Sequence, residues 1–257
     1  MNVHRQLLFV VFVAMLMLLG CKNNITHSAS YGKAYEVVVI NDIDSLLYNT
    51  LSVPMKGLPQ IEPTFDVVEI TSDKLKGDSK LVRNIVVLTI DKRQKRVDIS
   101  SKQNVYAQPQ VIINIVAPSQ SSLQIFLKKY GNELRNYLIK TELHRAQGDI
   151  ARQTNVKAAS TIYKMFGIRM QVPPELTTSK VGKNFLWLSN NASSGMVNLC
   201  IYSIGKGKFA QERDSVMRKN ILGEQKGMYM RTASIVSMVH GKYNSVTIRG
   251  LWEMQND

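Results

Sequence analysis

Cys21 is the residue whose surroundings indicate a definite chemical modification. It follows an uncharged, almost wholly apolar run at residues 7–19 and ends the tetrapeptide Leu18-Leu19-Gly20-Cys21, which has the pattern of a bacterial lipobox. At such a site the signal peptide is cut before the cysteine, and the thiol takes a diacylglycerol through a thioether bond. One such attachment binds a membrane weakly, so stable anchoring requires a further amide-linked acyl chain such as palmitate. We therefore predict lipid attachment at Cys21.

The length of the apolar run separates a cleaved signal from a permanent membrane span. Residues 7–19 number 13, whereas the apolar part of a secretory signal has about 7–15 residues and a spanning helix needs about 20. We expect residues 1–20 to be a signal peptide and residues 21–34, which are mostly small and polar, to be a flexible tether. The alternative is an ordinary signal peptide in which Cys21 is incidental.

The residues after Cys21 indicate the membrane to which a lipid-anchored protein is sorted. They are Lys22-Asn23-Asn24-Ile25, with neither an aspartate next to the cysteine nor an acidic run. An aspartate there is typical of inner-membrane retention, and an acidic run is typical of export to the cell surface. The prediction is a protein anchored in the outer membrane by its lipid and facing the periplasm.

The other chemically reactive residue types form no recognisable catalytic or metal motif. Cys200 lies in a strand-like apolar run, where a cysteine is more often a small buried hydrophobe than a nucleophile. The histidines outside the signal, His27, His144 and His240, have no Cys, Asp or Glu at metal-ligand spacing. We therefore predict no catalytic residue, no metal site and no cofactor.

Carboxylate pairs and aromatic residues are the remaining candidates for a site. The pairs suit solvated positions or helix starts rather than a catalytic dyad; they are Asp66/Glu69, Asp42/Asp44 and Glu212/Asp214. The proline-rich loop at residues 54–63 is either a binding surface or a structural corner, and its turn residues favour the corner. Trp187 and Trp252 lie in apolar runs typical of core packing.

The charge balance limits the partners. The chain of 257 residues carries a formal net charge of +14, with basic residues scattered along it. Such a surface is either solvated or attracted to an anionic membrane component, to which each nearby Lys or Arg contributes about 1 kcal/mol. Secretion argues against nucleic acid as a partner. The expected partners are thus the membrane, through the lipid on Cys21, and an envelope protein or an anionic envelope component.

Apolar periodicity predicts a mixed set of elements over residues 35–257. We expect an α+β fold with largely antiparallel sheets, one long helix and several shorter helices. Strands are predicted at residues 35–40, 65–70, 84–90, 96–100, 110–116, 168–172, 184–189, 196–204, 228–239 and 243–253. Residues 91–95 are expected to turn between two of these strands. Helices are predicted at 42–51, 120–150, 156–166 and 210–222, the second capped by Ser119, Ser121 or Ser122 and weakest at Gly131 and Gly148.

A short internal similarity suggests two related halves. Residues 83–88 match residues 183–188 in their pattern, with a strand and then a helix after each. Pseudo-duplicated α+β halves at 35–155 and 156–257 would explain the match, and chance similarity between apolar strands is the alternative.

Several segments in order resemble one family of envelope lipoproteins. Besides the lipobox, these segments lie at residues 35–40, 57–65, 83–85, 106–109, 184–188, 227–230 and 249–253. Together they are similar to the domain of unknown function 4837 family of Bacteroides-type bacteria, over essentially the whole chain after residue 20. The family has no assigned activity, so the resemblance implies no catalytic residue. Its members tend to continue past the Trp252-Glu253 segment, so we expect the chain to be a fragment with an exposed strand edge at 243–253.

Three functional hypotheses follow. The first is a non-catalytic envelope lipoprotein that binds a partner or maintains the envelope. The second is a periplasmic hydrolase of cell-wall or glycan material, which requires a cleft with two carboxylates. The third is a surface-exposed glycan-binding protein, which requires Trp187 and Trp252 to be exposed together.

Overall fold

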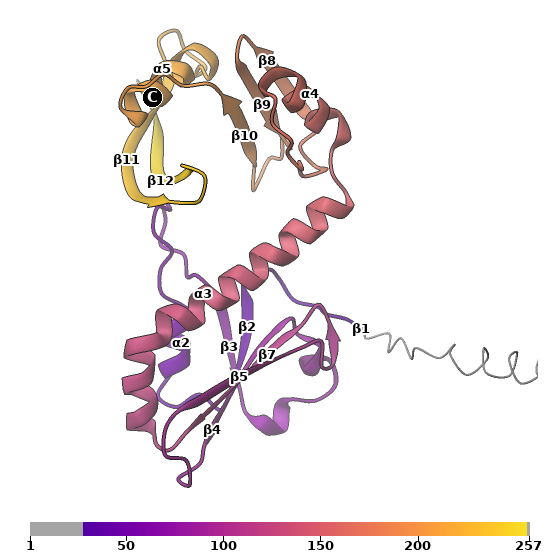
Figure 1. The fold of residues 1–257 in the computed structure, drawn as a ribbon, viewed down its shortest axis with the longest axis vertical. Coiled ribbons are helices and arrows are strands. Elements are labelled where there is room, and N and C mark those ends of the chain that lie inside the picture. The colour runs from indigo at the N-terminus through magenta and orange to yellow at the C-terminus, as the bar shows by residue number, and fades with distance from the viewer. Residues whose placement is uncertain (1–27, 256–257) are drawn as a thin grey trace, which may run out of the picture.

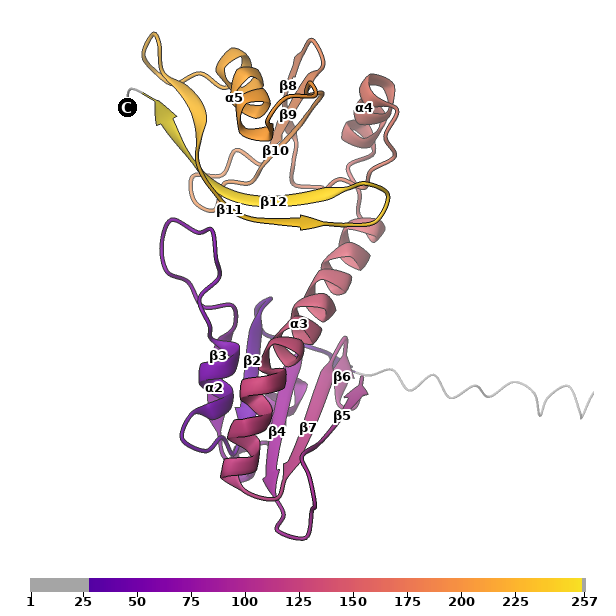
Figure 2. The same ribbon diagram turned by 60° about the vertical axis from the view of Figure 1, so that its left-hand side comes forward.

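The computed structural model describes residues 28–255, so the predicted signal segment, Cys21 and most of the predicted tether lie outside the described residues. The chain forms a five-stranded sheet packed against two helices, followed by a second group of smaller sheets and helices (Figure 1). The helix α3, Gln120–Arg152, runs along the five-stranded sheet and extends beyond it to the second group (Figure 2). An α+β class with one long helix and several shorter ones is confirmed.

The large sheet is mainly parallel, whereas the sequence predicted largely antiparallel sheets for the chain as a whole. Its order is β3-β2-β4-β7-β5, in which the first four strands are parallel and only β5 is antiparallel to its neighbour. The strands are β2 (Glu36–Ile40), β3 (Asp66–Ile70), β4 (Asn84–Ile90), β5 (Asp98–Gln103) and β7 (Val111–Ala117). Continuous β-branched runs such as β2 and β7 are typical of parallel strands covered on both faces. The smaller sheets after α3 are antiparallel, as predicted.

Both faces of this sheet are covered. On one face, Val39, Val86 and Ile113 pack against Leu123 and Leu138 of α3, and α2 (Leu46–Leu51) adds Leu47 and Leu51. On the other face, Val38, Ile85 and Ile112 pack under the segment that contains two short 3-10 helices, η1 (Ser72–Lys74) and η2 (Gly77–Leu81). Burial on both faces makes this sheet the main core of the molecule.

The turn predicted at residues 91–95 does not join neighbouring strands. β7 lies between β4 and β5, and β5 pairs antiparallel with β7 from Asp98↔Val116 to Gln103↔Val111. The hairpin therefore forms at residues 104–110, which contain the short strand β6 (Ala107–Gln108) and a cis Gln108-Pro109 bond. β6 in turn pairs with β1 (Ser28–Ala29), where the described chain begins.

The long helix begins as predicted and is continuous through both glycines. The Ser119 hydroxyl accepts a hydrogen bond from the Ser122 backbone N–H, which is the arrangement of an N-cap. Gly131 is a contact point rather than a weak point, since a Cβ built there would lie 2.8 Å from Thr50 Cγ2 of α2. The absence of a side chain at Gly131 therefore lets α2 approach α3 closely.

The second group of elements follows α3 after a short link. The helix α4 (Val156–Phe166) begins at an Asn155 cap and ends at Gly167, whose φ of 70° suits glycine. A three-stranded sheet of order β10-β9-β8 comes next, then α5 (Phe209–Asn220) and a long hairpin. The strands are β8 (Thr178–Gly182), β9 (Phe185–Ser189), β10 (Asn198–Tyr202), β11 (Tyr229–His240) and β12 (Val246–Gln255). β8 was not predicted, because it is an exposed edge strand with little apolar pattern.

The strand predicted at residues 168–172 is wrong. Val172 instead bonds back to the start of α4: its carbonyl accepts from the Asn155 N–H at 2.8 Å, and its N–H donates to Thr154 Oγ1 at 2.9 Å. These bonds use both backbone groups of Val172, which are therefore not free to pair with a neighbouring strand. Val172 is buried, whereas Ile168 and Met170 are exposed, so the alternation at 168–172 does not mark the buried face of a strand.

The two segments that match in sequence have different neighbours. Residues 84–88 belong to β4, which has parallel neighbours on both sides, whereas residues 185–188 belong to β9, which has antiparallel ones. Strand pairing therefore gives no support to a pseudo-duplication.

Candidate functional site: a basic pocket beside a buried ion-pair network

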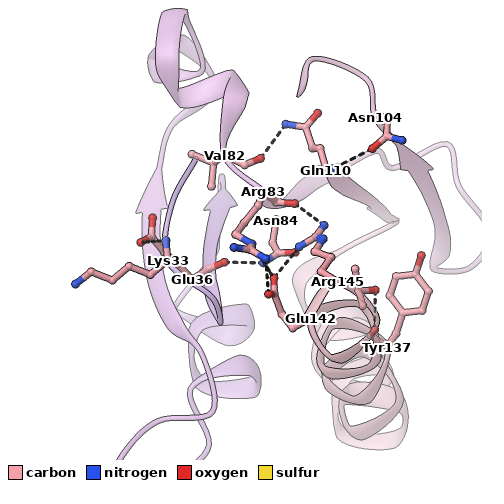
Figure 3. A network of polar contacts seen from close by, with 11 residues as sticks. Lys33, Glu36, Val82, Arg83, Asn84, Asn104, Gln110, Tyr137, Glu142 and Arg145 are labelled. Carbon is pink, nitrogen blue, oxygen red and sulfur yellow. Dashed lines mark hydrogen bonds and ion pairs between the residues drawn. The ribbon is translucent and has the colours of Figure 1, made fainter. Parts of the chain in front are cut away.

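A buried carboxylate lies between the five-stranded sheet and α3. The side chain of Glu142 is 2% exposed and forms ion pairs with Arg83 at 2.9 Å and with Arg145 at 2.6 Å (Figure 3). Glu142 and Arg145 are three residues apart on α3, so one helix face presents both. Arg83 comes from the segment that enters β4, so the network joins two parts of the chain.

Asn84 completes the network from within the sheet. Its Nδ2 donates to the Glu36 carbonyl at 2.8 Å and to Glu142 Oε1 at 2.7 Å, and its Oδ1 accepts from Arg145 Nη1 at 2.8 Å. Arg145 Nη2 also donates to the Arg83 carbonyl at 3.0 Å. These bonds fasten α3 to the amino-terminal ends of β2 and β4.

The network carries an excess of positive charge. Two guanidinium groups share the one carboxylate of Glu142. Burial lowers the pKa of Arg145, while the nearby Glu142 charge opposes that change. Within residues 28–255, every buried side-chain nitrogen and oxygen has a hydrogen-bond partner. The buried atoms of the network are therefore all bonded, and the network carries one positive charge in excess of its carboxylate.

A polar pocket of about 440 Å³ opens beside Arg145. The helix α3 contributes Tyr137, Lys140, Thr141, His144 and Arg145 to its lining. The hairpin at residues 103–111 contributes Gln103, Asn104, Gln108, Pro109, Gln110 and Val111. No Asp or Glu is among these lining residues, whereas Lys140 and His144 are exposed and can meet a ligand.

The hairpin that forms the opposite wall is held by side-chain to backbone bonds. Gln110 Nε2 donates to the Lys80 carbonyl at 2.6 Å and to the Val82 carbonyl at 2.8 Å, and its Oε1 accepts from the Tyr106 N–H at 2.9 Å. Asn104 Oδ1 accepts from the Gln110 N–H at 3.0 Å. The wall is thus pre-formed, so ligand binding does not have to order it.

The lining chemistry suits an anionic group. Lys140 and Arg145 supply positive charge, and amide and hydroxyl side chains supply donors that a phosphate or carboxylate accepts. With no carboxylate in the lining, an incoming anion meets no repulsion from the pocket itself. This arrangement can bind and orient an anion.

The structure accounts for the residues that the sequence singled out. Cys21 lies outside the described residues. Cys200 is a half-buried free thiol on β10, and burial raises its pKa, which disfavours the reactive thiolate. In residues 28–255, no group of three or more His, Cys, Asp or Glu side chains is placed to hold a metal ion.

Four of the six acids in the carboxylate pairs accept hydrogen bonds from other parts of the fold. Asp42 accepts from the backbone N–H groups of Leu47 and Tyr48 at the start of α2. Glu212 accepts from the Gly205 N–H at 3.0 Å. Asp214 accepts from the N–H and hydroxyl of Thr232 on β11. The remaining acids have other surroundings: Asp44 accepts from Gln120, and Asp66 and Glu69 lie exposed on β3.

The proline-rich loop and the two tryptophans also have structural surroundings. The loop closes on itself through a Met55 N–H to Glu62 carbonyl bond at 2.9 Å. Its tip approaches the hairpin of β11 and β12, since a Cβ built on Gly57 would lie 3.8 Å from the Cβ of Val236 on β11. Trp187 is half-buried on β9 and donates to Asn198, whereas Trp252 is 55% exposed on β12. The two rings therefore belong to different sheets.

Comparison with family models divides the chain near the end of α3. The model for the domain of unknown function DUF4837 matches residues 155–257. The resemblance to the DUF4837 family is thus confirmed for those residues. A second model, the domain of unknown function DUF8532, matches residues 30–151. The DUF4837 match is therefore narrower than the resemblance over the whole chain, and the basic pocket lies in the DUF8532 part.

Comparisons with curated proteins and with solved structures give no match.

Sequence reasoning missed the basic pocket. The pairing of Glu142 with Arg145 follows from their spacing, and Lys140 and Arg145 stand out as basic residues of the long helix. Their partners Arg83 and Asn84 lie some 60 residues earlier, at separations of 59 for Arg83–Glu142 and 58 for Asn84–Glu142. A polar Arg-Asn pair directly before an apolar strand is the available signal, because a polar residue at a strand start next to the core requires a partner.

Proposed function

We propose that this protein is a lipid-anchored, non-catalytic envelope protein that binds an anionic envelope component through its basic pocket. The observation that carries the proposal is the pocket lined by Lys140, His144 and Arg145 with no acidic residue among its lining side chains. The surplus guanidinium of the network behind it adds to the attraction.

The predicted anchor supports a location at a membrane surface. Cys21 lies seven residues before Ser28, so an extended chain between them spans at most about 24 Å. Ser28 and Ala29 pair with Ala107 and Gln108, and Gln108 lines the basic pocket. A lipid on Cys21 would therefore keep the pocket near the membrane that holds it. Within residues 28–255, no helix has the length and apolarity needed to cross a membrane.

The residues after Cys21 support the periplasmic face of the outer membrane as the site of anchoring. Protease treatment of intact cells tests this placement. Digestion of the protein without lysis would contradict it.

The other two hypotheses have less support. A hydrolase of glycan material needs two carboxylates facing one cleft, but the bonded candidate acids accept from a helix start, a loop and a strand instead. A glycan-binding surface needs exposed aromatic rings side by side, but Trp187 is half-buried and bonded to Asn198. The basic pocket explains more of the arranged side chains than either alternative.

Titration with inorganic phosphate tests the binding role. The titration uses a variant that begins at residue 21 and carries Cys21→Ser. This variant keeps every residue that the structure describes. We expect Lys140→Gln with His144→Gln to weaken phosphate binding about tenfold or more, because the ammonium charge of Lys140 is lost and the His144 ring is replaced by a neutral amide. Lys157→Gln with Lys164→Gln on α4 is the control and should leave binding unchanged, since both side chains are exposed away from the pocket lining. Equal weakening by both pairs of substitutions would reject the pocket as the binding site.

Capture of partners tests the wider role. The lipidated protein should retain an anionic envelope component from solubilised membranes, and the Lys140/His144 variant should lose it. Retention by the variant at the wild-type level would contradict the proposal.

A further inference from the structure

The basic pocket continues into an apolar groove along the edge of the sheet. A second pocket of about 330 Å³ lies between β5 and α3, and Tyr137 lines both pockets. Its walls include Ile99 of β5, Ile113 of β7, and Phe126, Tyr130 and Leu134 of α3. A third pocket of about 470 Å³ shares Ile99, Phe126 and Tyr130 with the second and extends toward the start of β5. The three pockets follow one another between β5 and α3, and we call them together the groove.

The two ends of this groove differ in chemistry. The end at Lys140 and His144 is basic and polar, whereas the middle is lined mainly by aliphatic and aromatic side chains. Large apolar side chains lie open to solvent along it: Ile99 is 43% exposed and Tyr130 is 40% exposed. Open apolar side chains next to a cationic pocket match a ligand that carries an anionic head and an apolar tail.

The edge position of β5 leaves room for such a tail. β5 pairs with β7 on one side and is the outermost strand of the sheet order. The Tyr137 hydroxyl bonds to Ser101 Oγ at 3.2 Å where the basic and apolar pockets meet, which fixes the ring at the junction. A chain that leaves the basic pocket past Tyr137 would lie over Ile99, Ile113 and Leu134 between the strand and the helix.

We propose that this groove binds a phosphorylated lipid, with its phosphate in the basic pocket and an acyl chain between β5 and α3. The proposal rests on the proposed anion-binding function and deepens it by naming the ligand class. The predicted lipid on Cys21 supplies the reason for choosing a lipid: the chain enters the fold at β1, which pairs with β6 at the rim of the basic pocket. The site is thereby held close to a membrane that contains such ligands.

Binding of three soluble probes tests the proposal, with the chain from residue 21 that carries Cys21→Ser. The probes are inorganic phosphate, an alkyl phosphate below its critical micelle concentration, and a neutral alkyl glycoside with the same chain. The alkyl phosphate should bind at least about tenfold more tightly than inorganic phosphate, because the groove removes methylene groups from water. The neutral glycoside should bind more weakly than the alkyl phosphate, because it lacks the charge that Lys140 meets.

Groove variants separate this inference from the proposed function. Ile99→Ser with Tyr130→Ser should bring alkyl phosphate binding to the level of inorganic phosphate and leave inorganic phosphate binding unchanged. Val156→Ser on α4, an apolar residue that is 72% exposed, is the matched control and should change neither. Both substituted groove side chains are partly open, so a folded variant is expected, and circular dichroism checks it.

Distinct results would overturn the two claims. Equal affinity for alkyl phosphate and inorganic phosphate, with Lys140 and His144 still required, would show that the groove binds no alkyl chain. That result would contradict the lipid proposal but not the anion site. Equal affinity for the glycoside and the alkyl phosphate would show that the phosphate group does not contribute to binding, which would contradict a phosphorylated lipid as the ligand. Binding of inorganic phosphate that does not depend on Lys140 and His144 would overturn the proposed function itself.

Discussion

The two parts of the chain that match separate family models differ in how they use apolar side chains. In residues 30–151, a five-stranded sheet is covered on both faces, and the only buried acid of the part, Glu142, is fully bonded. In residues 155–257, the buried cluster is smaller, and the hairpin of β11 and β12 has many apolar side chains open to solvent. These exposed residues are Ile235, Val236, Met238, Val239, Tyr243, Val246 and Trp252. The first part holds the basic pocket of about 440 Å³ with its bonded wall, whereas the pocket beside the hairpin of β11 and β12 measures about 130 Å³, so we place the site in the first part.

The largest expected effect comes from the buried ion-pair network. Glu142→Ala should lower the free energy of unfolding by about 3–5 kcal/mol, because two guanidinium groups lose their only carboxylate inside the protein. Chemical denaturation measures the change. Glu133→Ala on the exposed face of the same helix should cost far less, and similar losses for the two variants would mean that the network does not stabilise the first part.

The second largest loss of stability is expected from truncation of a buried side chain between α3 and the sheet. Leu138 has no exposed surface and lies in the main core cluster. Leu138→Ala should lower the free energy of unfolding by about 2–5 kcal/mol, since it removes buried methyl groups and leaves a cavity. A loss below 1 kcal/mol in the same denaturation measurement would indicate that α3 packs loosely on the sheet.

The helix caps allow a matched comparison between the two parts. Ser119→Ala at α3 should cost about 1 kcal/mol, because one backbone N–H loses its acceptor. Asn155→Ala at α4 should cost more, since Asn155 Nδ2 also donates to the Leu176 carbonyl at 2.8 Å. Thermal unfolding of both variants ranks them, and the reverse order would contradict the assignment of these bonds.

The smallest effect is expected in the hairpin. Val239 is 61% exposed, so Val239→Ser should change the free energy of unfolding by no more than about 0.5 kcal/mol. Denaturation at several protein concentrations measures it. A large loss, or one that depends on concentration, would show that another surface covers the hairpin and would weaken the contrast between the two parts.

The elements that local pattern determines were predictable. The apolar period of α3, its serine cap at Ser119 and the stop of α4 at Gly167 all appear at or near the expected residues. The hairpin of β11 and β12 was expected too, because its two apolar runs flank a short turn.

Contacts between residues that lie far apart in the sequence were not predictable. The parallel pairing of β2 with β3 and β4 leaves only a continuous apolar run in the sequence, which does not specify a neighbour. Glu142 could be paired with Arg145 from their spacing, but its contacts with Arg83 and Asn84 depend on how α3 crosses the sheet. The pocket appears only after that crossing is known, since its two walls are far apart in the chain.

A titration with inorganic phosphate followed by amide chemical shifts tests the central claim most directly. The chain from residue 21 with Cys21→Ser is labelled, and the shifts are followed for both parts at once. We predict that the largest changes occur at residues 103–111 and 137–145, around Lys140 and His144. Changes concentrated in residues 155–255, or absent around Lys140, would contradict the placement of the binding site in the first part.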